Sequence, residues 1–203
     1  MAELSRYEGD LEPEEDYEQL RFDGLSFDDA DAVACHFMDC AFESLSFGGG
    51  RLRKSRFTDV TMREVRFVAT ELAETAWQDV TLADCALAGV QAFSAGLRRV
   101  VFRDSKLDSV NFRGGSLIDV TFENCVLLDA DFGGARLQRV SFGGCTLARA
   151  DFTKVTCTEV DLRGARLGIT AGYESLRGAT IDSVQLVELA PLLARHLGLT
   201  VSD

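Results

Sequence analysis

Six cysteines and two histidines are the residues of this sequence best suited to bind a metal or to act as nucleophiles and bases. They are Cys35, Cys40, Cys85, Cys125, Cys145, Cys157, His36 and His196. No two cysteines form the CxxC pair that is typical of a zinc site. Neither histidine stands in a recognisable Ser-His-Asp or Cys-His arrangement. We therefore expect no metal, no cofactor and no catalytic residues, and so no enzyme.

Acidic and glycine-rich fragments also resemble functional sites in composition. Asp28-Asp29-Ala30-Asp31 could suggest a metal site, and Gly48-Gly49-Gly50 could suggest a phosphate-binding loop. A phosphate loop needs a strand before it, a helix after it and Lys-Ser or Lys-Thr directly after its last glycine, and this segment does not have that pattern. We interpret the acids as a solvated face and the glycines as turns.

A strict spacing of large apolar residues accounts for most of these features. Stepping by five from Phe22 to Leu167 visits 30 positions, and 27 of them hold Phe, Leu, Met or Trp. The position two residues earlier is small or β-branched in nearly every repeat, and it holds five of the six cysteines. These cysteines therefore read as small buried residues rather than ligands.

A period of five fits neither an α-helix, with 3.6 residues per turn, nor a flat strand, with a period of two. It predicts a chain that turns a corner every five residues. Phe and Leu also alternate with a period of twenty in the C-terminal half, which predicts four pentads per coil and seven to eight coils. The predicted core columns are Phe102, Phe122 and Phe142; Phe112, Phe132 and Phe152; and Leu107, Leu127 and Leu147.

Individual pentads resemble the A-(D/N)-(L/F)-x-x motif of the pentapeptide repeat proteins. Ala130-Asp131-Phe132, Ala150-Asp151-Phe152 and Val160-Asp161-Leu162 are examples. The resemblance implies an all-β fold, a right-handed quadrilateral β-helix, here with a short α-helical cap at its C-terminus. The uninterrupted register is similar to that of the loop-free, gyrase-inhibiting quinolone-resistance proteins of mycobacteria, and more distantly to that of the Qnr proteins.

That resemblance implies a non-enzymatic DNA mimic that binds DNA gyrase or topoisomerase IV and protects it from quinolone-type poisons. The alternative is a structural or scaffolding module with another protein partner. The net charge of −12 disfavours direct binding to nucleic acid or to anionic membranes. The sequence lacks a signal-like N-terminus and any apolar stretch of about 20 residues, so we expect a cytoplasmic protein.

The negative charge is concentrated at the N-terminus. Residues 1–35 hold 12 acidic and 2 basic residues, whereas residues 36–203 hold 21 acidic and 19 basic residues. No continuous acidic stripe is expected along the rest of the rod. The candidate partner-binding acids are Asp10, Glu14, Glu15, Asp16, Asp23, Asp28, Asp29, Asp31 and Glu43.

The two ends of the repeat predict caps. Residues 1–20 are expected to form an acidic cap or tail, with a short helix over 12–20 that buries Tyr17 and Leu20. The β-helix is expected over 21–181. Residues 182–203 are expected to form a helical cap, begun by Asp182 or Ser183, broken by Pro191 and ended by Gly198.

The leucines of the C-terminal segment recur at a helical spacing. They are Leu186, Leu189, Leu193 and Leu197. The family resemblance implies a homodimer formed through this segment. The alternative is a cap that folds onto its own coil.

Phe93 is the one Phe that departs from the period, and it follows Ala92, where a large core residue is expected. Either the coil shifts its register locally to bury Phe93, which we favour, or Phe93 is an exposed contact.

Overall fold

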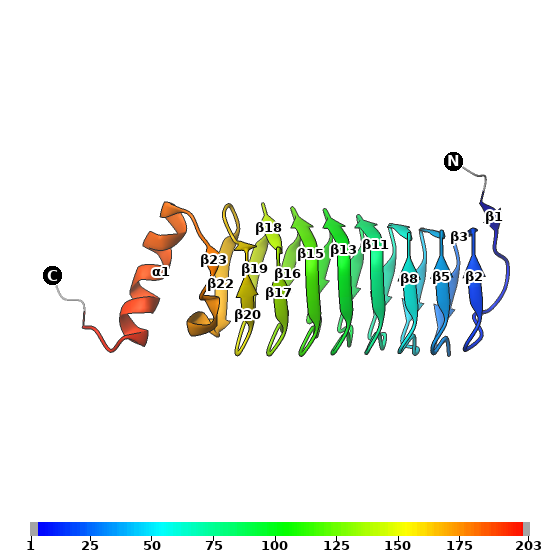
Figure 1. The fold of residues 1–203 in the computed structure, drawn as a ribbon. Coiled ribbons are helices and arrows are strands. Elements are labelled where there is room, and N and C mark those ends of the chain that lie inside the picture. The colour runs from blue at the N-terminus through cyan, green and yellow to red at the C-terminus, as the bar shows by residue number, and fades with distance from the viewer. Residues whose placement is uncertain (1–3, 201–203) are drawn as a thin grey trace.

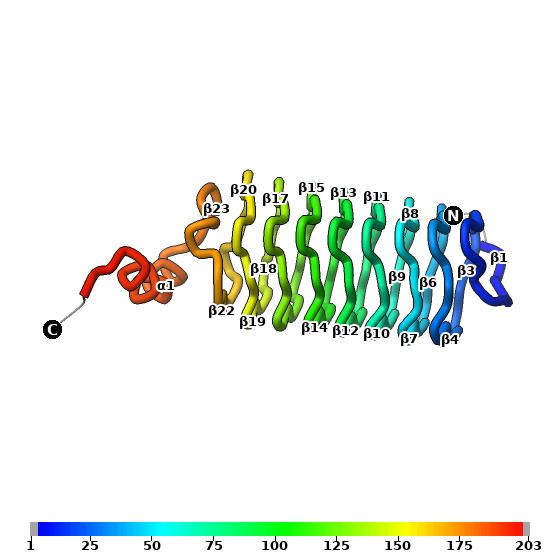
Figure 2. The backbone as a smooth tube through the Cα atoms, turned by 90° about the horizontal axis from the view of Figure 1, so that it is seen from below, coloured from blue at the N-terminus to red at the C-terminus, as the bar shows by residue number. Residues whose placement is uncertain are grey.

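The chain winds into a single rod of stacked coils. The computed structural model describes residues 4–200, and it shows a right-handed parallel β-solenoid of about eight turns with one helix at its C-terminal end (Figure 1). Figure 2 shows the coils stacked side by side with their strands running across the axis of the rod. Equivalent residues of neighbouring coils pair at a spacing of twenty, as in Phe47 with Phe67 and Phe102 with Phe122.

The strands belong to two sheets. The first contains β1 (Ser5–Arg6), β2 (Asp16–Glu18), β3 (Leu20–Asp23), β5 (His36–Met38), β6 (Ala41–Glu43), β8 (Arg56–Thr58), β9 (Thr61–Arg63), β11 (Ala76–Ala83), β13 (Gly96–Arg103), β15 (Ser116–Glu123), β17 (Arg136–Gln138), β18 (Ser141–Gly143), β20 (Thr156–Thr158), β21 (Val160–Asp161) and β23 (Ala179–Thr180). The second contains β4 (Ser26–Asp28), β7 (Ser46–Gly48), β10 (Arg66–Val68), β12 (Ala86–Ala88), β14 (Lys106–Asp108), β16 (Val126–Leu128), β19 (Thr146–Asp151) and β22 (Arg166–Ala171).

Four faces surround the core, and each is named here by the inward residues that it carries. Face 1 carries Phe102, Phe122 and Phe142. Face 2, formed by the second sheet, carries Leu107, Leu127 and Leu147. Face 3 carries Phe112, Phe132 and Phe152 and is held by isolated parallel bridges such as Asn111 with Asp131. Face 4 carries Leu97, Leu117 and Leu137, and the long strands β11, β13 and β15 turn from face 4 into face 1.

The corners between faces use a left-handed backbone at the second residue after each central one. This conformation is common here even without glycine, since Asp104, Asn124 and 22 other non-glycine residues have φ between 49° and 63°. A left-handed L-residue costs about 1–2 kcal/mol. The corner amides offset this cost by bonding to the next coil, as Asn124 N does to the Gly143 carbonyl at 2.9 Å.

The interior is a set of stacked side-chain columns. On face 1 the rings of Phe102 and Phe122 stack at 4.8 Å, and those of Phe122 and Phe142 stack at 4.9 Å. Phe132 of face 3 meets Phe122 edge to face across the lumen at 6.4 Å. Face 4 carries its own aromatic column in the N-terminal half, where Phe37 stacks on Phe57 at 5.1 Å. All of these rings are buried.

The predicted register shift at Phe93 was wrong. Ala92 is buried at 5% exposure and Phe93 is exposed at 38%, because the bridges from Glu71 through Gln91 to Asn111 hold the register. The small side chain of Ala92 leaves a void of only about 10 Å³, which Trp77 and Phe112 also line.

The expected helix over 12–20 was also wrong. Residues 16–18 form β2, which pairs with β5, and Tyr17 stacks on Phe37 at 5.0 Å. Tyr17 lies one step before Phe22 on the five-residue period, so pairing with the next coil gives its ring a place in the core. The solenoid therefore begins within residues 1–20, since β1 also pairs with β3.

The C-terminal cap is one helix, α1 (Ser183–His196), and Pro191 lies inside it rather than dividing it. Asp182 accepts a bond from Gln185 N in a capping box. The buried Gln185 amide donates to the carbonyls of Leu162 and Ala165 at 2.5 Å and 2.6 Å, which ties α1 to the last coil. No helix within residues 4–200 has the length and apolar character needed to cross a membrane.

The core columns predict a large difference between an inward and an outward phenylalanine. Phe122→Ala should lower the free energy of unfolding by about 3–5 kcal/mol, because it leaves a cavity between two stacked rings. Phe93→Ala is the matched control and should change it by about 0.5 kcal/mol or less. Denaturant unfolding followed by circular dichroism measures both, and equal losses would contradict the assigned faces.

The corner geometry predicts opposite effects for two nearby glycines. A Cβ added at Gly134 or at Gly143 meets no atom within 4 Å, but only Gly134 has a positive φ, of 67°. Gly134→Ala should therefore destabilise the protein by about 1 kcal/mol through backbone strain alone. Gly143→Ala should be neutral or slightly stabilising in the same unfolding experiment. A loss of stability in Gly143→Ala as large as that in Gly134→Ala would count against this explanation.

Candidate protein-binding surfaces

The predicted partner-binding acids gather at one end of the rod but not on one face. Asp23 and Glu43 lie on face 1, Asp28 on face 2, Asp31 on face 3 and Asp16 on face 4. Arg21 pairs with Glu43 at 2.5 Å and reaches Asp23 at 3.4 Å, and Arg51 pairs with Asp31 at 2.8 Å. The predicted acids thus surround the first coils on all four faces, and nearby arginines neutralise part of their charge.

Arg–Asp pairs between consecutive coils neutralise much of the remaining rod. Three of these pairs join both carboxylate oxygens to one guanidinium. They are Asp79 with Arg99, Asp119 with Arg139, and Asp129 with Arg149. In each case the hydrogen bond from the arginine lowers the pKa of the aspartate. These acids are therefore charged at neutral pH but already matched by a neighbouring cation.

One short acidic column along the rod was missed by the sequence reasoning. Glu64, Asp84 and Asp104 occupy the same corner of face 1 in three consecutive coils, and no ion pair involves them within residues 4–200. Ser44 donates to Glu64 at 3.1 Å at one end, and Asn124 donates to Asp104 at 3.3 Å at the other. Their spacing of twenty was the available signal, but the net charge of the whole face concealed it.

Large apolar side chains are exposed singly along the rod and together in the C-terminal segment. Met38 on face 4 and Val126 on face 2 are each 42% exposed. Phe93 on face 3 and Val68 on face 2 are 38% and 44% exposed near the middle of the rod. On α1, Val187 is 73% exposed and Leu186 52%, whereas Leu189 is buried; Leu197, directly after the helix, is 71% exposed. Leu193 is half-buried. The four predicted leucines therefore differ in burial: Leu189 is buried, Leu193 is half-buried, and Leu186 and Leu197 are exposed.

The cysteines and histidines do not converge. All six cysteines are free thiols, five of them buried and Cys157 half-buried. Burial raises the pKa of Cys85 to about 11, which keeps this thiol protonated. Within residues 4–200, no group of three or more His, Cys, Asp or Glu side chains could hold a metal ion.

The fold and these surfaces define a class: a right-handed quadrilateral β-solenoid whose side chains present faces, corners and ends to the solvent. The family model of a pentapeptide repeat region matches residues 30–112 and 75–152. The chain belongs to the pentapeptide repeat proteins. A comparison with curated protein sequences gives no significant match.

Solved structures of the same fold include proteins from different settings. A trypsin-treated form of QnrB1, described as a plasmid-mediated fluoroquinolone resistance protein, aligns with a TM-score of 0.51 at 16% identity, covering 92% of this chain and 100% of that one. HetL from the cyanobacterium Nostoc sp. Strain PCC 7120, described as involved in the regulation of heterocyst differentiation, aligns with a TM-score of 0.38 at 19% identity, covering 84% and 91%. A pentapeptide repeat protein of the Arabidopsis thaliana thylakoid lumen aligns with a TM-score of 0.42 at 19% identity, covering 62% and 71%.

Proposed function

We propose that this protein acts by binding a protein partner, and that the partner is a type II topoisomerase, DNA gyrase or topoisomerase IV. In this role the N-terminal part of the rod takes the place of duplex DNA and protects the enzyme from quinolone-type poisons. No chemical step is involved, because the proposed effect comes from occupying a binding surface.

The observation that carries the proposal is the concentration of unmatched carboxylates in the first coils. Glu14, Glu15, Asp28 and Asp29 are exposed and have no ion-pair partner within residues 4–200. A surface that binds DNA is positively charged and attracts such a surface at long range. The likeness in fold to QnrB1, a fluoroquinolone resistance protein, supports the choice of enzyme.

The column of Glu64, Asp84 and Asp104 extends this charge along the corner of face 1. Strands in neighbouring coils are about 4.8 Å apart, so the three carboxylates form a line of regularly spaced negative charge. Beyond Asn124 the column is uncharged, with Gly144 and Gly164 at the equivalent corners. The proposed contact therefore involves the N-terminal half of the rod rather than its whole length.

The test is a gyrase supercoiling and DNA-cleavage assay with purified protein, with and without a fluoroquinolone. The wild type should inhibit supercoiling or reduce drug-induced cleavage in a dose-dependent way. The variant Glu14→Gln, Glu15→Gln, Asp28→Asn, Asp29→Asn should need at least a fivefold higher concentration for the same effect.

The matched control removes the same number of charges from exposed acids elsewhere on the rod and cap: Asp108→Asn, Glu159→Gln, Glu174→Gln, Glu188→Gln. It should behave as wild type. No effect of the wild type at high micromolar concentration would refute the topoisomerase proposal and favour a scaffold with another protein partner. An equal loss of effect in both variants would mean that the effect on gyrase depends on the total net charge of the protein and not on the position of the acids.

We further propose that the active form is a homodimer joined through α1. Val184, Leu186 and Val187 of α1 are 66%, 52% and 73% exposed. Several exposed apolar side chains on one short helix are typical of an interaction site.

Sedimentation velocity tests this dimer. The wild type should sediment as a dimer at micromolar concentration, and Val187→Glu should give a monomer with an unchanged circular dichroism spectrum. Val68→Glu, the same substitution at an exposed valine of the solenoid, is the control and should remain a dimer. A monomeric wild type, or a dimeric Val187→Glu, would refute the proposal.

A further inference from the structure

The N-terminal end of the solenoid leaves two strands, β2 and β4, paired on one side alone within residues 4–200. β3 is paired on both sides, by β1 and β6, whereas β2 pairs with β5 alone within residues 4–200. In the next coil the amide of His36, which stacks on Asp16, donates back to the carbonyl of Glu15. Asp16 occupies the same position in its coil as His36, so its amide points in the same direction, toward the N-terminal end of the rod. No strand of the described chain lies there to accept its hydrogen bond.

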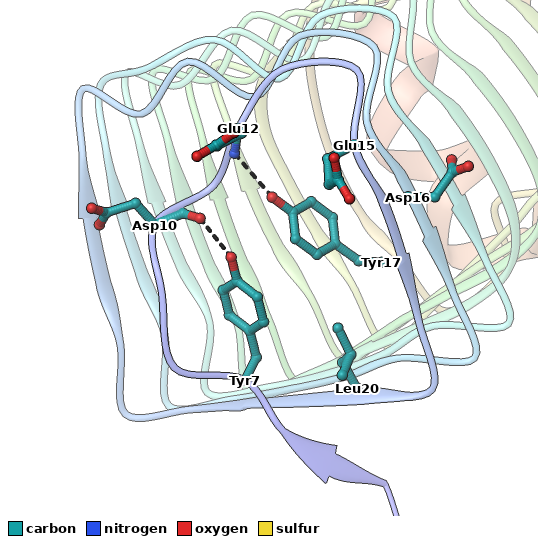
Figure 3. A pocket seen from close by; sticks show the side chains of 7 residues that line it. All are labelled: Tyr7, Asp10, Glu12, Glu15, Asp16, Tyr17 and Leu20. Carbon is teal, nitrogen blue, oxygen red and sulfur yellow. Dashed lines mark hydrogen bonds between the residues drawn. The ribbon is translucent and has the colours of Figure 1, made fainter.

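The chain between β1 and β2 makes a shortened coil that leaves a pocket beside this edge. Arg6 pairs with Arg21 at a spacing of 15, whereas Asp16 pairs with His36 at the usual spacing of 20. The connecting segment is therefore five residues short and crosses inside the outline of the coil below it (Figure 3). An open pocket of about 370 Å³ lies there, and its lining includes Tyr7, Glu12, Glu15 and Tyr17.

Two tyrosines fix the shape of this pocket. The Tyr7 hydroxyl donates to the Asp10 carbonyl at 2.5 Å, and the Glu12 amide donates to the Tyr17 hydroxyl at 2.9 Å. The two rings meet edge to face at 5.4 Å, and Tyr7 also packs on Phe22 at 4.7 Å. Burial raises the pKa of Tyr17, so its hydroxyl stays neutral. The pocket is thus formed before any ligand binds, which lowers the entropic cost of binding.

The charge around the open edge is of one sign. Residues 8–18 hold seven acids and no lysine or arginine. Within residues 4–200, the only basic side chains within 4 Å of these acids are Arg6, which lies 3.8 Å from Glu8, and His36, which lies 3.3 Å from Asp16. Carboxylates beside aromatic rings favour a lysine or arginine side chain, which both groups attract.

We propose that this end of the rod binds an extended, basic peptide segment of a partner protein by strand addition to β2. The peptide backbone pairs with the outward groups of Asp16 and Glu18, and a lysine or arginine side chain enters the pocket. Main-chain bonds then supply affinity and the pocket supplies selectivity for a cation. A second copy of this chain is a poor occupant, because two ends of the same strong negative charge repel each other. The inference does not depend on the topoisomerase proposal.

Fluorescence anisotropy tests the proposal with a fluorescein-labelled ten-residue peptide of alternating lysine and threonine. We expect saturable one-to-one binding by the full chain. The same peptide with every internal backbone nitrogen methylated keeps its charge but cannot donate to a strand, and it should bind at least fivefold more weakly. In amide NMR spectra, the unmethylated peptide should shift the signals of Asp16 and Glu18 more than those of the other exposed strands.

Two protein variants separate the pocket from general electrostatics. Glu15→Gln with Asp16→Asn should weaken binding at least fivefold, and the control Glu174→Gln with Glu188→Gln, at the other end, should leave it unchanged. Equal binding of the methylated peptide, or equal losses in both variants, would overturn the proposal in favour of non-specific charge attraction. Self-association of the first variant with undiminished peptide binding would also overturn it. Glu15 and Asp16 would then serve only to prevent this edge from pairing with a second copy of the chain.

Discussion

The parallel hydrogen-bond ladder with a spacing of twenty residues is the interaction on which the rest of the structure depends. It places every side chain about 4.8 Å from its equivalent in the next coil. Inward side chains must then pack on their own equivalents, and this is why Phe102, Phe122 and Phe142 form a stack with separations near 4.9 Å. The same ladder compensates the strained corners, because each left-handed residue also places its amide toward the next coil.

The outer surface is organised by the same spacing. An aspartate followed by an arginine twenty residues later is close enough for a two-point ion pair, as in Asp119 with Arg139. Three acids at the same spacing, as in Glu64, Asp84 and Asp104, instead give a line of unmatched charge. The chemistry of a face is therefore decided by the order of residues along a column, and not by the composition of a single coil.

The ladder cannot be completed at the ends, and the two ends of this rod solve that problem differently. At the C-terminus, α1 covers the last coil, and the Gln185 side chain bonds to the carbonyls of Leu162 and Ala165. At the N-terminus of the described chain, β1 covers β3, whereas β2 and β4 each keep an unpaired edge, and β2 lies beside a pocket and many carboxylates. One end exposes apolar side chains of α1 and the other exposes charge, so the two ends suit partners of different chemistry.

The sequence by itself determined the coil, because the side-chain period of five and the column period of twenty are both local, repeated signals. It also placed five of the six cysteines at small inward positions and a concentration of acids at the N-terminal end. Where the repeat is irregular, local sequence signals predicted the wrong secondary structure. Pro13 and the acids after it are typical of a helix start, yet pairing with β5 made residues 16–18 a strand. Pro191 is typical of a break, yet it lies within α1.

Only the tertiary structure decided the outcome at positions where distant residues compete for the same space or charge. Phe93 stays exposed because the bridges of Gln91 to Glu71 and Asn111, in two other coils, hold the register. Arg21 matches Glu43 while Glu64, Asp84 and Asp104 stay without a cation, which depends on side-chain reach between coils. Periodicity fixes where a residue lies in a repeat, whereas the ends and the surface charge depend on contacts between coils, which only the folded rod specifies.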